Sequence, residues 1–147
     1  MIKIKHICVQ DVLDNSHLLD AYAEESKNSI VPEHDPDVEV YMSLEQSGAL
    51  KVFGAYEGSD LVGFISVTYT VLPHYSSLSG RIESFFVLKE HRKFGTGKRL
   101  IKAVEKQAKS MGCQSLHLSA PVGGDLSKAA RLFGYTNTSL LFMKELV

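Results

Sequence analysis

The sequence predicts an α/β domain in which helices flank a mixed β-sheet. Segments of strand-like alternation and of helical periodicity follow one another in the order β-α-α-β-β-β-α-β-α-β. A strand, a glycine-containing turn and a long amphipathic helix are continuous over residues 81–112. The chain has 147 residues, of which 44% are hydrophobic and 22% charged, as in one ordinary globular domain. We therefore expect a single domain spanning residues 1–147.

The first half of the chain is predicted to contain three strands and two helices. Alternation predicts strands at residues 3–9, 50–57 and 61–70, and Gly58-Ser59-Asp60 between the last two indicates a hairpin. Apolar residues at helical spacing predict a helix over 11–27 and a shorter one over 37–46. The two prolines within residues 28–36 predict a loop between these helices.

The second half begins with a predicted loop and ends with a predicted strand. Residues 72–80 are rich in serine and contain Pro73, so we expect a loop there. A strand at 82–88 leads into a helix that ends before Gly112 and has Leu100, Ile101 and Val104 on its apolar face. A strand at 115–120, a helix at about 125–133 and a last strand within 138–146 complete the expected order.

The turn between the strand at 82–88 and the next helix has the features of an anion site. The first turn of a helix presents unpaired amide N–H groups, and the helix dipole adds positive potential there. Gly95 and Gly97 allow a ligand to approach the backbone, because they carry no Cβ. The surrounding basic residues are Arg92, Lys93, Lys98 and Arg99. We therefore predict phosphate binding at this turn, rather than a tight connection alone.

Two common nucleotide-binding motifs do not fit this turn. A P-loop needs glycine at the position of Arg92 and serine or threonine at the position of Arg99. A dinucleotide-binding fingerprint needs a third glycine at the position of Leu100 and normally opens the first unit of the chain. The sequence therefore argues against both a nucleoside triphosphatase and a dinucleotide-binding protein.

The pattern that does match is Arg-x-x-Gly-x-Gly, formed by Arg92, Gly95 and Gly97. In this motif and its strand–turn–helix setting, the chain resembles the GCN5-related N-acetyltransferase (GNAT) superfamily. The resemblance is strongest over residues 81–112 and weaker over nearly the whole chain. It implies a mixed, mostly antiparallel sheet, flanked by helices, in which a central pair of parallel strands splays apart. It also implies acetyl-CoA as co-substrate, no metal, and direct acetyl transfer to a primary amine within a ternary complex.

The resemblance further implies which residues hold acetyl-CoA. The pantetheine arm would pair with the backbone of residues 85–88, and the pyrophosphate would lie on the amides of residues 92–98. The thioester would occupy the opening between residues 85–88 and 117–120, and Pro121 fits a strand that stops pairing there. The expected co-substrate contacts are Phe85, Phe86, Val87, Leu88, Arg92, Lys93, Phe94, Gly95, Thr96, Gly97 and Lys98.

Glu83 is the candidate general base. An amine is mostly protonated at neutral pH and must lose a proton before it attacks a thioester. Many members of the family have glutamate at this position, and strand alternation predicts that Glu83 lies on the same face as Val87. Glu83 is equally well interpreted as a strand-end residue paired with Arg81 or a nearby lysine, so both interpretations stay open.

No general acid is implied for the leaving thiol. Gly134-Tyr135 matches a Gly-aromatic pair of the family, but Ala130 occupies the position of the usual tyrosine. A thiol is a tolerable leaving group, and water, Ser119 or Ser127 are the remaining donors. Two alternatives to the N-acetyltransferase stay open: a catalytically silent acyl-CoA-binding or regulatory domain, and acyl transfer from another CoA thioester to a hydroxyl group.

The resemblance also implies that the residues between the first two helices and the loop before the central strand shape the acceptor pocket. The residues assigned to it are His34, Tyr69, His74, Tyr75 and Ser119. Four acidic residues within 33–39 favour a cationic acceptor, either a small-molecule or a peptide amine, although such a run is more often a solvated loop.

Composition argues against several other classes of partner. A formal charge of −1 disfavours the broad basic face of a nucleic-acid-binding protein. No apolar run approaches membrane-spanning length, and residues 1–10 alternate instead of forming a signal-peptide core. Cys8 and Cys113 lack metal-ligand spacing, which favours reduced, buried thiols in a cytoplasmic protein without a bound metal. The sequence leaves open whether the protein forms a homodimer.

Overall fold

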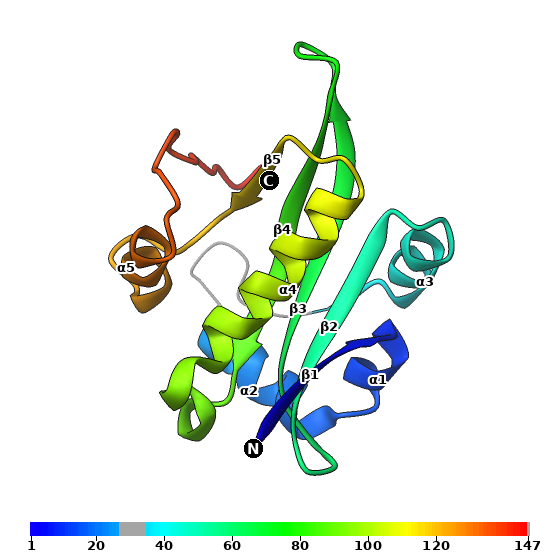
Figure 1. The fold of residues 1–147 in the computed structure, drawn as a ribbon, viewed down its shortest axis with the longest axis vertical. Coiled ribbons are helices and arrows are strands. Elements are labelled where there is room, and N and C mark those ends of the chain that lie inside the picture. Colours follow the sequence, from blue (N-terminus) through cyan, green and yellow to red (C-terminus); the bar gives the residue numbers. More distant parts are fainter. Residues whose placement is uncertain (27–34, 147) are drawn as a thin grey trace.

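The structure is a computed structural model that describes residues 1–26 and 35–146. Its described part contains one five-stranded sheet in the order β1-β2-β3-β4-β5 (Figure 1). The strands are β1 (Ile2–Ile7), β2 (Leu50–Glu57), β3 (Asp60–Leu72), β4 (Ser77–Val87) and β5 (Ser115–Leu118). The helices are α1 (Val9–Leu13), α2 (Ser16–Ser26), α3 (Val38–Gln46), α4 (Thr96–Ser110) and α5 (Asp125–Leu132). Two short 3-10 turns, η1 (Lys89–His91) and η2 (Lys93–Gly95), connect β4 to α4.

The sheet is mixed and mostly antiparallel, which confirms the predicted fold class. β1 to β4 pair antiparallel in sequence order, and among the described strands only β4 and β5 run parallel. The parallel pairing begins at Ser79 opposite Ser115 and ends at Ile82 opposite Leu118. β4 continues to Val87, whereas the chain leaves the sheet after Leu118. The two strands therefore splay apart beyond Ile82, and this opening positions the candidate site.

Helices cover both faces of the sheet. α4 crosses one face (Figure 1), and it buries Leu100 and Val104 against the strands because its apolar residues recur at helical spacing. On the opposite face α2 buries Leu18. The residues of β3 from Leu61 to Val67 are buried, as expected for a strand covered on both sides. The hydrophobic core therefore extends above and below the strand that pairs with β4.

Two predicted elements have different boundaries in the structure. Residues 11–27 do not form one helix, because Asn15 accepts a hydrogen bond from the Leu18 amide at 3.1 Å and starts a new helix, α2. The loop predicted at 72–80 is largely strand, since residues 77–80 pair with residues 69–72 of β3. Cross-strand pairing outweighs the weak strand preference of a serine-rich segment. Most of the loop predicted at 28–36 lies outside the described residues.

The strand predicted within residues 138–146 is wrong. Residues 135–146 have no regular secondary structure, and Leu140, Leu141 and Phe142 are exposed there. An apolar run forms a strand only where a sheet edge accepts its backbone hydrogen bonds, and none of the described strands pairs with it. Among the described strands, β4 and β5 therefore form the end of the sheet rather than its centre.

Candidate active site

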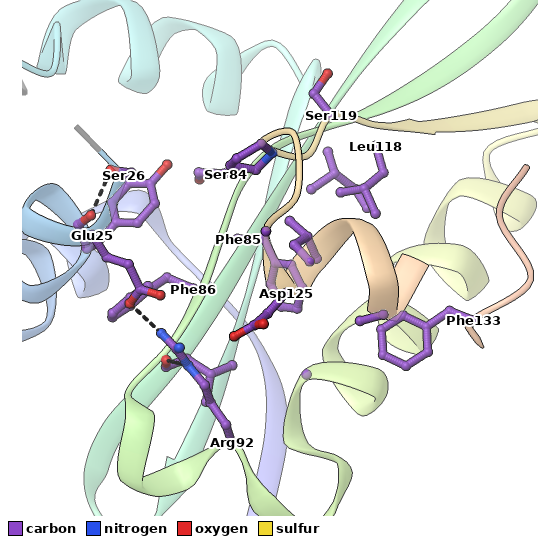
Figure 2. A pocket seen from close by; sticks show the side chains of 18 of the residues that line it. Glu25, Ser26, Ser84, Phe85, Phe86, Arg92, Leu118, Ser119, Asp125 and Phe133 are labelled. Carbon is purple, nitrogen blue, oxygen red and sulfur yellow. Dashed lines mark hydrogen bonds and ion pairs between the residues drawn. The ribbon is translucent and has the colours of Figure 1, made fainter. Parts of the chain in front are cut away.

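A cavity of about 650 Å³ opens where β4 and β5 separate. Its walls come from α2, β4, the turn before α4, the segment after β5, and α5. Figure 2 shows Phe85 and Phe86 of β4 between Glu25 of α2 and the segment that carries Ser119. The predicted residues that line the cavity are Glu83, Phe85, Phe86, Val87, Arg92, Gly95, Gly97, Lys98 and Ser119. The structure thus brings together the predicted base and most of the predicted co-substrate contacts.

The edge of β4 that borders the cavity offers backbone hydrogen-bonding groups. The Leu88 amide donates to the Val62 carbonyl at 2.9 Å, so Leu88 directs its peptide groups toward β3. This direction alternates along a strand, so Phe85 and Val87 direct theirs away from β3 and toward the opening. Pairing with β5 has already ended at Ile82. An extended ligand can therefore add to β4 here as a further strand would.

The turn before α4 presents amide groups. Phe94 and Gly95 have φ angles of 65° and 77°, in the left-handed region, and they turn the chain sharply into the helix. Gly95 is the N-cap of α4; no side chain caps the helix, and its first turn carries no acidic residue. The first amides of this 15-residue helix are therefore available to an anion, and Lys98 adds a positive charge at the cavity wall.

The two glycines of the motif meet different structural needs. At position 95 the left-handed backbone favours glycine, and space does not, because a Cβ there would contact nothing within 4 Å. Gly97 lies within α4 without a positive φ, but a Cβ there would lie 3.2 Å from Cζ of Phe85. Gly97 therefore allows the Phe85 ring to pack beneath the first turn of the helix, at the wall of the cavity.

Arg92 is engaged by the protein itself. Its Nε donates to the Val87 carbonyl at 2.7 Å, and its Nη2 donates to the Glu25 carboxylate at 2.5 Å. Its guanidinium also lies 5.4 Å from the centre of the Phe86 ring. Arg92 therefore joins α2, the end of β4 and the turn, so it shapes the candidate anion site instead of offering it a free cation.

Four predicted co-substrate residues do not line the cavity: Leu88, Lys93, Phe94 and Thr96. Thr96 is 1% exposed, and its hydroxyl reaches the Lys93 carbonyl at 3.5 Å. Leu88 is buried, whereas Phe94 is 97% exposed. These four residues therefore belong to the end of β4, the turn and the start of α4, but they do not line the cavity.

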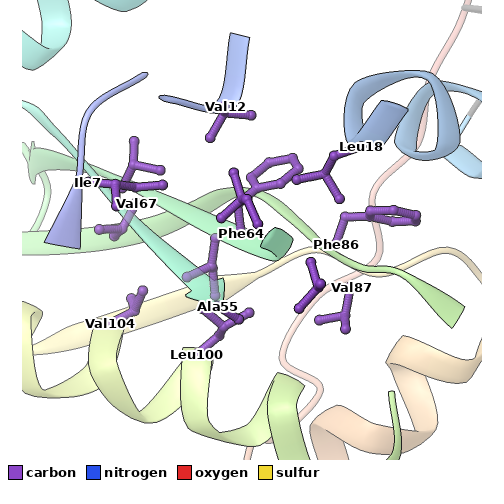
Figure 3. Packing of buried hydrophobic residues seen from close by; sticks show 14 of the residues in the cluster. Ile7, Val12, Leu18, Ala55, Phe64, Val67, Phe86, Val87, Leu100 and Val104 are labelled. Carbon is purple, nitrogen blue, oxygen red and sulfur yellow. The ribbon is translucent and has the colours of Figure 1, made fainter. Parts of the chain in front are cut away.

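Glu83 lies at a β-bulge, and the bulge changes the face of its side chain. The β3–β4 register shifts between Ser66 and Val67, which leaves Glu83 as the extra residue of β4. Phe86 and Val87 lie on opposite faces, toward α2 and α4 respectively (Figure 3). Glu83 faces the helices on the Phe86 side, because it hydrogen-bonds to α3. The predicted shared face with Val87 is therefore wrong, since strict alternation does not survive a bulge.

Two hydroxyl groups hold the Glu83 carboxylate. Tyr41 of α3 donates to Oε1 at 2.5 Å, and Ser66 of β3 donates to Oε2 at 2.7 Å. Arg81, one of the expected alternative partners, donates instead to the Ser119 hydroxyl at 3.2 Å. Glu83 therefore belongs to a hydrogen-bonded cluster at the cavity wall and not to an ion pair with Arg81.

Two tyrosines beside Glu83 remain protonated at neutral pH. Burial, and then the charge of Glu83, raises the pKa of Tyr22 to about 12. Burial, the hydrogen bond to Glu83 and the charge of Glu83 raise the pKa of Tyr41 above its ordinary value. Both side chains are therefore phenols rather than phenolates. Neither tyrosine is predicted as a site residue from the sequence, because helical spacing indicates which face of a helix is apolar but not which strand it meets.

Most of the predicted acceptor residues lie away from the cavity. Tyr69, His74 and Tyr75 belong to the outer part of the β3–β4 hairpin, and none of them lines the cavity. The Tyr69 hydroxyl is buried with no hydrogen-bond partner among the described residues, and burial raises the pKa of Tyr69 to about 12. His34 falls outside the described residues. Of the described members of this set, only Ser119 lines the cavity.

The α5 side of the cavity contributes a carboxylate but no acid at the expected place. Ala130 has no ionisable group, and the Ser127 hydroxyl donates to the Gly124 carbonyl at 2.8 Å, within its own helix turn. Ser119 keeps its own proton available, because its hydroxyl accepts from Arg81. Asp125, in the first turn of α5, also lines the cavity and was not singled out by the sequence.

The amino-acid sequence matches the model of a known protein family. Residues 16–134 match the model of the acetyltransferase (GNAT) family. This match covers more than half of the chain, so the protein belongs to the GNAT family. Comparison with curated protein sequences gives no match.

Solved structures share the fold over nearly the whole chain. A ribosomal-protein-alanine N-acetyltransferase from Brucella melitensis biovar Abortus 2308 is 23% identical, with a TM-score of 0.75 and coverage of 99% of this chain and 100% of that one. An aminoglycoside acetyltransferase from an uncultured soil metagenomic sample, in complex with sisomicin, is 21% identical, with a TM-score of 0.77 and coverage of 99% and 97%. AAC(6')-Iy, in complex with the bisubstrate analogue CoA-S-monomethyl-acetylneamine, is 20% identical, with a TM-score of 0.75 and coverage of 100% and 99%. At these identities the likeness shows the fold alone.

Three further observations concern partners. Across residues 1–26 and 35–146, every helix is too short or too polar to cross a membrane. In the same residues, no group of three or more His, Cys, Asp and Glu side chains is placed to hold a metal ion. Cys8 and Cys113 are free thiols, but Cys8 is exposed and Cys113 is half-buried, so the prediction that both are buried is wrong.

Proposed function

We propose that the protein transfers the acetyl group of acetyl-CoA to a primary amine by direct attack in the cavity between β4 and β5. One observation carries this proposal: an open strand edge, an uncapped helix N-terminus and the Glu83 carboxylate meet in one cavity. Membership of the GNAT family supports acetyl transfer as the reaction class. A CoA bisubstrate analogue bound to one protein of the same fold supports a CoA thioester as the donor.

The chain's own groups suit acetyl-CoA as a substrate. We expect the amide groups of its pantetheine arm to pair with the peptide groups of Phe85 and with the Val87 amide, because the Val87 carbonyl already accepts from Arg92. The pyrophosphate suits the uncapped amides at the start of α4, with Lys98 as the neighbouring cation. Arg92 supports this arrangement indirectly, because its contacts to Val87 and Glu25 fix the turn.

The chemistry requires the nitrogen to lose two protons and the thiolate to gain one. Glu83 accepts the first proton from the substrate ammonium, directly or through water, and the free amine forms a bond to the acetyl carbon. The carbon–sulfur bond then breaks, and the second nitrogen proton passes to the thiolate of CoA through water or through the Ser119 hydroxyl, which regains the proton that it gives. Glu83 returns its proton to solvent. A thiolate needs less help than an alkoxide, so the absence of a tyrosine at Ala130 is compatible with turnover.

The acceptor side of the cavity suits a cationic amine, from a small molecule or a peptide. The carboxylates of Glu83 and Asp125 line the cavity together with Tyr22, and both carboxylates and aromatic rings attract an ammonium ion. Proteins of the same fold are described as acting on aminoglycosides and on a ribosomal-protein alanine, which supports an amine as the acceptor. We place this activity in the cytoplasm.

A second candidate is a catalytically silent acyl-CoA-binding or regulatory domain. Two observations favour it: Ala130 cannot donate a proton, and the Ser127 hydroxyl is used within its own helix. Such a protein would keep the strand edge and the anion site but would release no thiol.

Free-thiol release separates these candidates. The protein is incubated with acetyl-CoA and a panel of polyamines, aminoglycosides, peptides with free amino groups, and alcohols. We expect thiol release that depends on one class of primary amine. Acetyl-CoA binding without release for any amine would refute the transferase, and release with alcohols alone would reassign the acceptor to a hydroxyl group.

A further inference from the structure

We propose that Tyr41 of α3 is a positioning residue, which holds the Glu83 carboxylate in place for proton transfer. This inference rests on the proposed function, because it gives Glu83 the role of base. Tyr41 does not itself line the cavity. It therefore acts through Glu83 and not by touching the substrate.

The bulge explains why Glu83 needs an external support. A residue within a regular ladder is fixed by its cross-strand neighbours, whereas the extra residue of a bulge has no residue opposite it. Tyr41 and Ser66 supply that support from α3 and β3, each donating to a different carboxylate oxygen. The Ser66 hydroxyl lies 2.6 Å from the Ser84 hydroxyl as well. The carboxylate is thereby held from two elements, at the wall of the cavity.

Helix α3 is anchored well enough to position a side chain. The Asp37 side chain caps its N-terminus by accepting from the Val40 amide at 3.1 Å. Near its C-terminus, the Glu45 carboxylate accepts from the Val9 amide of α1 at 2.8 Å. The cap defines the first turn of α3, and the Glu45 contact ties its last turn to α1, so the Tyr41 hydroxyl approaches Glu83 from a defined direction.

Tyr41 also remains a donor at every pH at which the enzyme would work. Burial and the neighbouring Glu83 raise the pKa of Tyr41, so its hydroxyl keeps the proton that it shares with the carboxylate. The ionised carboxylate accepts this hydrogen bond better than the neutral acid does. Removal of the hydroxyl should therefore make it easier to protonate Glu83.

The other charged or titratable groups near Glu83 stay the same when only the Tyr41 hydroxyl is removed. Among the described residues, they are Tyr22 and Glu25 of α2, Arg92 and Lys98 at the turn and Asp125 of α5, which line the same cavity, and Arg81 of the same strand. A change in pH dependence after this substitution therefore reports on the Tyr41 hydrogen bond.

The test compares Tyr41→Phe with a matched control. Tyr135 is also a partly buried tyrosine that donates to a carboxylate, that of Glu105 at 2.9 Å, but it does not line the cavity. We expect Tyr41→Phe to move the acidic limb of the kcat profile to higher pH and to lower kcat at neutral pH by roughly tenfold. The KM for acetyl-CoA should not change. Tyr135→Phe should leave the limb unchanged.

A second measurement does not depend on activity. Carbon-13 NMR of carboxyl-labelled glutamate follows the titration of Glu83, assigned by its loss in Glu83→Gln. We expect the midpoint to differ between Tyr41→Phe and wild type, in the direction that loss of a hydrogen bond to the carboxylate produces. An unchanged midpoint, or an unchanged acidic limb in an active variant, would overturn the proposal. If wild type releases no thiol with any amine, the proposed function fails, and the positioning role of Tyr41 fails with it whether or not the midpoint moves.

Discussion

Substitution of Gly95 should separate stability from ligand binding, because Gly112 at the other end of α4 provides a matched control. Gly95 and Gly112 have φ angles of 77° and 85°, and a Cβ at either position would contact nothing within 4 Å. Alanine at either position therefore introduces backbone strain alone, which costs about 1 kcal/mol. We expect both variants to melt roughly 2–4 °C below wild type. Gly95→Ala should also weaken acetyl-CoA binding, because it distorts the turn that presents the amides.

A substitution of Gly97 tests the same site by filling it. A Cβ there would lie 3.2 Å from the Phe85 ring, so Gly97→Val displaces this ring at the cavity wall and adds bulk beside the first amides of α4. We expect acetyl-CoA affinity to fall by on the order of tenfold, about 1.4 kcal/mol. Calorimetric titration measures the affinity, and thermal unfolding measures the stability. Wild-type affinity in both Gly95→Ala and Gly97→Val, or an equal loss in Gly112→Ala, would refute this reasoning.

Three further predictions follow from the same geometry. Glu83→Gln should lower kcat by on the order of 10²–10⁴ with little change in acetyl-CoA affinity, and a variant with wild-type turnover would make Glu83 structural. Arg92→Ala removes contacts to Val87, Glu25 and Phe86, so it should reduce the free energy of unfolding by about 2 kcal/mol; a melting temperature equal to that of wild type would contradict these contacts. The pKa of Tyr22 rises from 10.0 to about 12 on folding, so the folded state binds this proton more tightly and the resulting stabilisation is lost as the pH rises from 10.0 to about 12. Denaturant titrations at increasing pH should show the free energy of unfolding falling over this range. In Tyr22→Phe, the free energy of unfolding should fall less steeply with pH.

The sequence predicted the cofactor side of the site better than the acceptor side. The strand, turn and helix over residues 81–112 are contiguous, so local periodicity and two glycines were enough to locate the cavity wall. The acceptor side depends on residues far apart in the chain, such as Tyr41 of α3 and Glu83 of β4, which meet only when the helix packs against the sheet. No local pattern indicates such a meeting. His74 and Tyr75, chosen for their loop position, lie instead at the outer end of a long hairpin.

The errors about particular elements have the same physical origin. The bulge at Glu83 arises from the register between β3 and β4, and it reverses the face that strict alternation predicts. Residues 77–80 become strand because residues 69–72 are available to pair with them. Residues 138–146 have a composition suited to a strand but find no edge among the described strands. In each case tertiary pairing, which propensity does not contain, decides the outcome.

The most direct test of the central claim follows the acetyl group itself. The protein is mixed with acetyl-CoA that carries a carbon-13-labelled acetyl group and with the amine that gives the fastest thiol release, and both amine and protein are examined by mass spectrometry. Direct transfer within the cavity predicts label on the amine and none on the protein, with label transfer strongly reduced in Glu83→Gln. Label bound covalently to the protein when the amine is omitted, or an unlabelled amine after complete incubation, would contradict the account.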